Sequence, residues 1–209
     1  MKIRNWTVMG SVVLAFLLTW AITGEVLAES IETIRAAAEA GDAEAQRELG
    51  LRYEQGNGIE RNWTEAANWY RKAAEQGNTK AQISLGAFYQ GGVGVEKDQN
   101  EAVKWYRKAA DQGDVDALMR LGLFYTSGVG VEKDTTEATK WFRKAMEQCR
   151  KAAEQGDAEM QWRLGGFYEF GFGVEQDKAE AEKWFQKAAE QGNFAAQQRL
   201  RKIEEAENK

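Results

Sequence analysis

The sequence repeats itself with a period of 36 residues, and this periodicity restricts the fold more than any other feature. Four copies of one pattern begin at Gly41, Gly77, Gly113 and Gly156, and a partial fifth copy begins at Gly192. Each copy predicts a helix, a loop with two glycines and a second helix. One such hairpin cannot bury its apolar face alone, whereas stacked copies can. The sequence therefore predicts an all-α protein, an α/α solenoid of about four 36-residue helix-loop-helix repeats with capping helices.

The recurring residues also predict where each helix begins and what it packs against. The first helix of the first copy follows Asp42, whose side chain can accept a free backbone N–H. Its apolar face recurs at Ala45, Leu49 and Tyr53. Gly50 lies within this helix at a cost in helix propensity, so we expect a neighbouring helix to approach closely there. The second helix follows an Asn or Asp with Glu three residues later, a spacing similar to a capping box.

The copies divide the chain into segments. We expect a capping helix at 29–40 and, at 201–209, the end of the C-terminal capping helix with a tail that frays from Glu204. That last helix should run from Asn193 to about Glu205. Together the repeats cover 41–200. Their expected boundaries are 41–76, 77–112, 113–155 with an insertion, 156–191, and a partial copy at 192–200.

The third copy contains seven extra residues. The segment RKAMEQC at 143–149 is followed by RKAAEQG at 150–156, so that Cys149 replaces the turn glycine. Seven residues form nearly two helical turns, about 10 Å, with an angular drift of only about 20°. We expect the second helix of this copy to continue to about Gln155 and to displace the fourth repeat. A neutral tandem duplication and a notch that shapes a partner site both explain the insertion.

Cys149 is the only cysteine of the chain. We expect a monomer with an inert thiol at this position. If the thiol were exposed outside the cytoplasm, it could form an intermolecular disulfide and link two chains.

The N-terminal residues differ in composition from the repeats. Lys2 and Arg4 precede an uncharged, largely apolar stretch at 5–24, and Val26-Leu27-Ala28 supplies small or modest residues before Glu29. This pattern is typical of a secretory signal peptide covering residues 1–28, cleaved after Ala28. The protein would then be exported and have no membrane contact after cleavage. An uncleaved membrane anchor is the alternative, because about 20 apolar residues can span a bilayer.

The composition excludes several classes of site. The chain has no histidine and one cysteine, which excludes Ser-His-Asp and Cys-His catalytic sites, intrachain disulfides and thiolate metal clusters. The glycine-rich loops follow helices and lack the Gly-Lys-Ser/Thr ending of a phosphate-binding loop. The net charge is −5, which does not favour binding to nucleic acid phosphates. We therefore expect no catalytic residues, cofactor, metal or nucleic acid.

The repeats resemble Sel-1-like repeats, relatives of the tetratricopeptide repeats, from Gly41 to about Leu200. A representative copy is GNTKAQISLGAFYQGGVGVEKDQNEAVKWYRKAADQ at 77–112. The resemblance implies a curved α/α superhelix that acts as a non-enzymatic adaptor for a protein or peptide. Secreted bacterial members resemble envelope or host-interaction proteins, which implies the periplasm or the extracellular space. Some cysteine-rich relatives are linked to β-lactam binding or hydrolysis. This chain departs from them because it lacks their paired cysteines. The alternative function that these relatives imply is a regulator of, or an enzyme in, cell-wall or β-lactam metabolism.

One face of each first helix is the candidate binding surface. Positions equivalent to 45, 46, 49, 50 and 53 share the packing side, and the residues opposite vary between copies. In the related tetratricopeptide fold, that opposite side lines the concave groove. Apolar patches with polar rims tend to bind partners, although these side chains could also fill gaps between repeats. At the border of the two faces, Phe88, Phe124 and Phe167 are expected in the core. The groove candidates are Arg47, Leu51, Ile83, Met119, Leu123 and Trp162.

Overall fold

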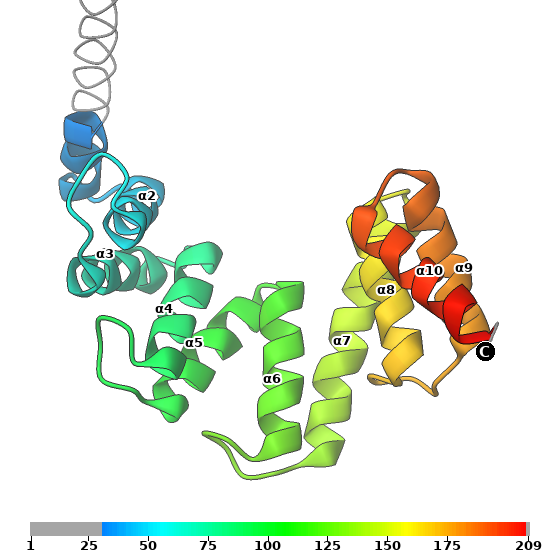
Figure 1. The fold of residues 1–209 in the computed structure, drawn as a ribbon. Coiled ribbons are helices and arrows are strands. Elements are labelled where there is room, and N and C mark those ends of the chain that lie inside the picture. Colours follow the sequence, from blue (N-terminus) through cyan, green and yellow to red (C-terminus); the bar gives the residue numbers. More distant parts are fainter. Residues whose placement is uncertain (1–30, 208–209) are drawn as a thin grey trace, which may run out of the picture. The chain divides into compact units, whose positions relative to one another are not determined.

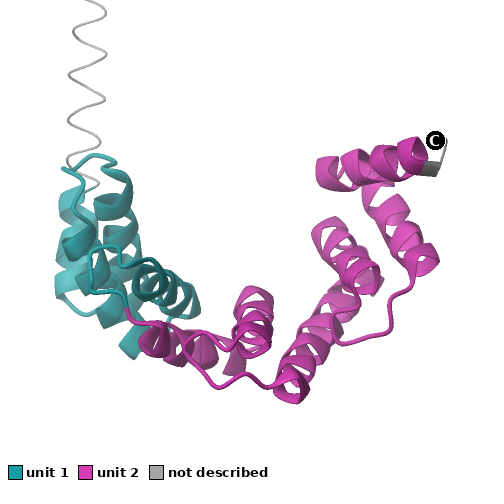
Figure 2. Cartoon of the chain, turned by 60° about the horizontal axis from the view of Figure 1, so that its bottom comes forward, with its two compact units in different colours: residues 1–97 teal, residues 98–209 magenta. Residues whose placement is uncertain are grey.

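The structure, a computed structural model, describes residues 31–207 of the 209-residue chain. They belong to two compact units, Met1–Lys97 and Asp98–Lys209, which Figure 2 shows in different colours. Each unit is described by itself. The predicted signal peptide at residues 1–28 lies outside the described residues.

All regular elements among the described residues are helices (Figure 1). Unit 1 contains a helix over 31–39 and then α2 (Ala43–Gln55), α3 (Trp63–Glu75) and α4 (Thr79–Gly91). Unit 2 contains α5 (Gln99–Asp111), α6 (Val115–Ser127), α7 (Thr135–Glu154), α8 (Ala158–Phe170), α9 (Lys178–Glu190) and α10 (Phe194–Glu207). Within each unit, successive helices pack on one another. The predicted all-α, α/α solenoid fold is confirmed.

We call the first helix of each repeat its A helix (α2, α4, α6, α8 and α10) and the second its B helix (α3, α5, α7 and α9). The A helices begin and end as the sequence predicts. The side chain of Asp42 accepts a hydrogen bond from the Ala45 N–H at 2.7 Å, and α2 ends at Gly56 with φ 71°. α6 is delimited in the same way by Asp114 and Gly128. These local signals fix the length of each A helix at 13 residues before α10.

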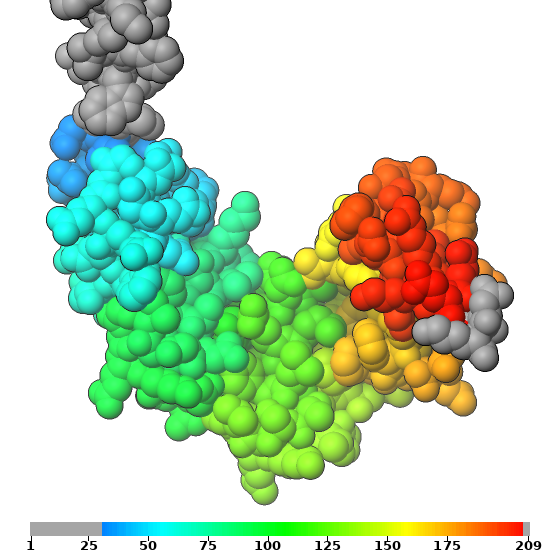
Figure 3. Space-filling model, in the orientation of Figure 1, coloured from blue at the N-terminus to red at the C-terminus, as the bar shows by residue number. Residues whose placement is uncertain are grey.

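The glycine inside the A helix allows the close approach that was expected. A Cβ on Gly50 would lie 2.8 Å from the ring of Tyr70 on α3. A Cβ on Gly122 would overlap the ring of Phe142 on α7. The ribbons of α6 and α7 are drawn apart in Figure 1, but side chains fill the space between them in Figure 3. In α2, α6 and α8, the A helix is therefore packed closely against a buried aromatic ring of its own B helix.

Successive repeats are joined by an arginine of one B helix and a tyrosine of the next A helix. Within unit 1, Arg71 donates to the Tyr89 hydroxyl at 2.8 Å. Within unit 2, Arg150 donates to the Tyr168 hydroxyl at 2.7 Å. The two residues are 18 positions apart in both pairs. Arg150 belongs to the second half of the duplicated segment, so the duplication preserves the register of the junction that follows it.

The insertion lengthens α7 as predicted. This helix has 20 residues and ends at Glu154, whereas α3, α5 and α9 have 13. The loop after α8 is displaced with it. A Cβ on Gly173 would lie 2.7 Å from the Arg143 nitrogen in the middle of α7. The equivalent Gly130 instead meets Gln99, the first residue of α5. The fourth repeat is therefore shifted along α7, as expected.

α10 closes the described part of unit 2 as the A helix of the fifth copy. Arg201 stands where the earlier A helices have Gly50, Gly122 and Gly165. A further helix could not approach α10 as closely as α3 approaches α2. α10 continues to Glu207, two residues beyond the end expected near Glu205.

Candidate functional site

In unit 1, the groove candidates Arg47 and Leu51 on α2 and Ile83 on α4 are all half-buried. Arg47 pairs with Glu44 at 2.7 Å and with Glu48 at 3.4 Å. The hydrogen bond to Glu44 raises the pKa of Arg47, and the same bond lowers the pKa of Glu44. The guanidinium is thus held by acids of its own helix. Arg47 contributes a neutralised polar edge to this face and is not a free cation.

In unit 2, Leu123 on α6 is the most exposed candidate, with 48% of its surface accessible. Met119 lies one turn earlier on the same helix and is half-buried. On α8, Gly166 faces open space, since a Cβ there would meet no atom within 4 Å. The side chains at these positions leave part of the A-helix face of unit 2 apolar and uncovered.

Trp162 plays a larger packing role than a free groove residue would. Its ring lies 5.0 Å from the ring of Phe185 on α9, and it packs against the buried cluster that α9 and α10 form. It remains only half-buried. For this residue the structure agrees with the alternative expectation, that it fills a gap between repeats.

The three border phenylalanines pack in the core, as predicted. Phe88 and Phe124 are 5% exposed and Phe167 is 2% exposed. Phe88 contacts Tyr70 edge to face with ring centroids 5.5 Å apart. These residues define the boundary at which the A-helix face becomes core.

Several acids of the A helices are engaged within the protein. Glu44 accepts a hydrogen bond from Asn78, the N-cap of α4, at 2.9 Å. The fourth copy has Asp157 at this cap and lacks the amide donor. Arg163 on α8 instead pairs with Asp116 on α6 and with Glu159 at 3.0 Å. This ion pair connects the two A helices across the displacement that the insertion creates.

Cys149 has no exposed surface, and burial raises the pKa of its thiol to about 11. It lies on the core side of α7. A disulfide between two chains would require α7 to open locally, so this geometry favours the inert thiol over the disulfide-linked dimer.

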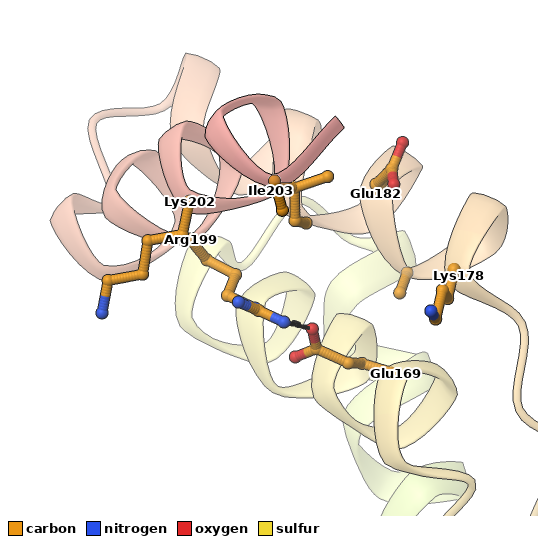
Figure 4. A pocket seen from close by; sticks show the side chains of 8 residues that line it. Glu169, Lys178, Glu182, Arg199, Lys202 and Ile203 are labelled. Carbon is orange, nitrogen blue, oxygen red and sulfur yellow. Dashed lines mark hydrogen bonds and ion pairs between the residues drawn. The ribbon is translucent and has the colours of Figure 1, made fainter. Parts of the chain in front are cut away.

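One feature of unit 2 was not predicted from the sequence: a cavity of about 260 Å³ between α8, α9 and α10 (Figure 4). Glu169 on α8 is 91% buried, and its carboxylate accepts a hydrogen bond from Arg199 of α10 at 2.7 Å. That bond raises the pKa of Arg199. A sequence signal did exist, because Ile203 stands where earlier copies have Phe88, Phe124 and Phe167. The lining residues are Glu169, Lys178, Ala181, Glu182, Arg199, Lys202, Ile203 and Ala206.

Two further searches concern only the described part of the chain. Between residues 31 and 207, no three acidic or cysteine side chains are grouped so that they could hold a metal ion. Over the same residues, no helix combines the length and the apolar character that crossing a bilayer needs.

The family model called Sel1 repeat matches residues 43–78, 79–114, 115–148 and 158–193. The chain belongs to the Sel1 repeat family. Sel1 repeat proteins are in general protein-interaction adaptors and non-catalytic scaffolds. The matches leave 149–157 uncovered, where the duplicated segment continues α7 in place of a turn.

Solved structures give the same result. The chain is 45% identical to c5321, a protective antigen present in uropathogenic Escherichia coli strains, over 81% of this chain and 35% of that one, with a TM-score of 0.63. It is 38% identical to a Sel1 repeat protein from Oxalobacter formigenes, covering 85% and 72% of the two chains, with a TM-score of 0.59. This Sel1 chain thus spans about a third of the E. coli protein. A comparison with curated protein sequences finds no match.

Proposed function

We propose that this Sel1 repeat chain is an exported, non-enzymatic adaptor that binds a peptide or protein on the outward faces of its A helices. The exposure of Leu123 beside Met119 on α6 supports this proposal most directly. Each hydrophobic side chain alone would be unremarkable on a soluble protein. Together they form an apolar strip along one turn, and Asp116 on the same helix is already paired with Arg163.

The adaptor mechanism follows from how firmly each A helix is held. Caps fix both of its ends, the glycine contact fixes its separation from the B helix, and arginine–tyrosine bonds fix the junctions. A partner would therefore meet a preformed surface, and little scaffold entropy would be lost on binding. We expect an apolar side chain of the partner to lie against Leu123 and Met119. Arg47, Leu51 and Ile83 would form the corresponding contact surface of unit 1.

Export is proposed from the pattern at residues 1–28, with the periplasm or the extracellular space as the destination. The E. coli protein that resembles this chain is described as a protective antigen, which fits a protein that antibodies can reach. Mass spectrometry of the protein from culture medium and periplasm tests this part. A mature chain beginning at Glu29 is expected, and an intact N-terminus in the membrane fraction would identify an uncleaved anchor.

The binding surface is tested by crosslinking the tagged full-length protein in the cell envelope and identifying the proteins that copurify. The test variant is Met119→Asp with Leu123→Asp. The control is Val129→Asp, which adds a charge to a loop residue of unit 2 with 44% exposure. A partner that is lost from the test variant and kept by the control supports the proposal. A partner kept by both variants, or no specific partner at all, would refute it.

A further inference from the structure

Within each unit, the loop of one repeat packs on the first turn of the B helix before it. We call this part of the B helix its loop seat. A Cβ on Gly94 would lie 2.9 Å from the backbone nitrogen of Thr64, in the first turn of α3. In unit 2, a Cβ on Gly130 would lie 2.5 Å from the carbonyl oxygen of Gln99, at the start of α5. The B-helix residue four positions after each first residue is buried: Ala67 is 0% exposed and Val103 is 4% exposed. The loop seats of α3 and α5 are therefore closed.

Among residues 31–207, no loop occupies the equivalent seat on α9. Lys178 corresponds to Trp63 and Gln99, and Glu182 corresponds to Ala67 and Val103. Lys178 is exposed and Glu182 is half-buried, and the 260 Å³ cavity opens beside both. The cavity thus occupies the place that a repeat loop takes on α3 and α5.

A change in α10 enlarges this space. Ile203 replaces the phenylalanine that occupies the same position in α4, α6 and α8. Its smaller side chain lies with Ala181 and Ala206 along the cavity and leaves an apolar floor. Glu169 and Arg199 form the wall, and their ion pair fixes it in place (Figure 4). This ion pair holds α8 and α10 together at the wall of the cavity.

The rim of this seat carries a charge that the other seats lack. Lys178 and Lys202 lie on either side of the Arg199–Glu169 pair (Figure 4), and both are exposed. In the complete copies, the positions of these two lysines hold only uncharged residues: Trp63, Gln99 and Thr135 for the first, and Leu51, Ala87, Leu123 and Gly166 for the second. The one acid on this rim, Glu182, offsets only part of that positive charge.

The loops that fill seats elsewhere in the chain share one chemistry. Residues 92–96 and 128–132 read Gly-Val-Gly-Val-Glu, and residues 171–175 read Gly-Phe-Gly-Val-Glu. Each places apolar side chains between glycines and follows them with a carboxylate. We infer that the cavity between α8, α9 and α10 binds an extended segment of a partner protein with this chemistry, small apolar residues followed by an acid. The floor accepts the apolar residues, and Lys178 at the rim attracts the carboxylate.

The test uses a synthetic peptide, acetyl-GVGVEKD-amide, which has the sequence of residues 92–98. It is titrated into the ¹⁵N-labelled mature protein, and amide shifts are followed by NMR. We expect shifts confined to α8, α9 and α10, with a Kd of about 1 mM, because a single short segment makes few contacts. The same peptide with Glu replaced by Lys should bind at least about fivefold more weakly because of the lysine rim.

The decisive variant is Lys178→Glu, which reverses the charge of an exposed residue of the cavity lining. It should keep the melting temperature and weaken peptide binding at least about fivefold. The A-helix variant Met119→Asp with Leu123→Asp should bind this peptide normally, so the two sites can fail independently. Absence of shifts at saturating peptide, or equal binding by Lys178→Glu, would overturn the inference. So would a dimer of the protein alone that Lys178→Glu abolishes, because the occupant would then be a second copy.

Discussion

Two neighbouring glycines of α8 allow a sharp test of the close packing between A and B helices. Gly165 and Gly166 both lie within α8 (Ala158–Phe170), and neither has a positive φ. Their surroundings differ completely. A Cβ on Gly165 would overlap the Phe185 ring and would lie 3.1 Å from the Ala181 carbonyl oxygen. A Cβ on Gly166 would have no neighbour within 4 Å.

The structure predicts opposite changes in the free energy of unfolding for the two alanine variants. Alanine in a helix interior is favoured over glycine by about 1 kcal/mol. Nothing opposes that gain at Gly166, so Gly166→Ala should raise the free energy of unfolding by about 0.5–1 kcal/mol. At Gly165 the new methyl group meets a ring with no exposed surface and a helix backbone, neither of which can move freely. Overpacking of this kind costs about 1–3 kcal/mol or more, so Gly165→Ala should be destabilised despite the gain in propensity.

Urea unfolding followed by circular dichroism measures both variants against the wild type. For a chain of this size, each kcal/mol also shifts the melting temperature by about 2–4 °C. Gly122→Ala provides a second trial of the same contact, since its Cβ would overlap the ring of Phe142. If Gly165→Ala is as stable as Gly166→Ala, the close approach of the helices is not what selects glycine, and the packing argument fails.

Three further predictions rest on other contacts. Burial raises the pKa of the Cys149 thiol to about 11, so the thiol's contribution to the free energy of unfolding should be fully present below the pKa of the unfolded thiol and should be lost as the pH rises from there to about 11. Urea unfolding at pH 8 and 10.5 should show this fall in the wild type, and Cys149→Ala should lack the part of the pH dependence that the thiol causes. Glu169→Gln removes the buried carboxylate charge that pairs with Arg199. It should lower the free energy of unfolding by about 1–3 kcal/mol after allowance for solvent around Arg199, whereas Glu159→Gln in an exposed pair should lower it by less than about 1 kcal/mol in the same denaturation assay. Deletion of residues 143–149 should shorten α7 by about 10 Å and return the Gly173 loop to the start of that helix, and unchanged distances between spin labels on α6 and α8 would contradict this register.

The sequence predicted those parts of the fold that local signals determine. Asp42 and Gly56 delimit α2 through bonds within a few residues, so the cap pattern was sufficient. The length of α7 was predictable for the same reason, because Cys149 removes the only stop signal between two helical segments. The repeat period then supplied the contact between the helices, since one glycine position recurs in every complete copy.

The remaining features depend on contacts between residues far apart in the chain. Trp162 was assigned to the open face from its position in α8, but its neighbour Phe185 is supplied by α9. The bond from Arg163 to Asp116 joins residues 47 positions apart and exists only because the insertion displaces one A helix. The cavity beside Ile203 likewise requires three helices to be placed before it can be seen. Helical periodicity cannot predict which side chain of another helix occupies a given space.

The structure also bears on whether the insertion in α7 is a built partner site or a tolerated duplication. Two contacts keep their sequence spacing across it: Arg150 lies 18 residues before Tyr168, and Gly173 lies 31 residues after Phe142, as Gly94 lies after Trp63. The second half of α7 therefore serves the fourth repeat as an ordinary B helix.

Only the first two turns of α7 lose their covering loop. There Thr139 takes the place of the buried Val103, and its hydroxyl donates to the carbonyl oxygen of Thr135 at 2.8 Å. A built partner site would be expected to present apolar side chains or unpaired polar groups at this point. Thr139 is a small polar residue whose hydroxyl already has a hydrogen-bond partner within α7, so it can face solvent without a partner protein. The step beside α7 is therefore better explained as a duplication that the solenoid absorbed because seven residues nearly complete two helical turns.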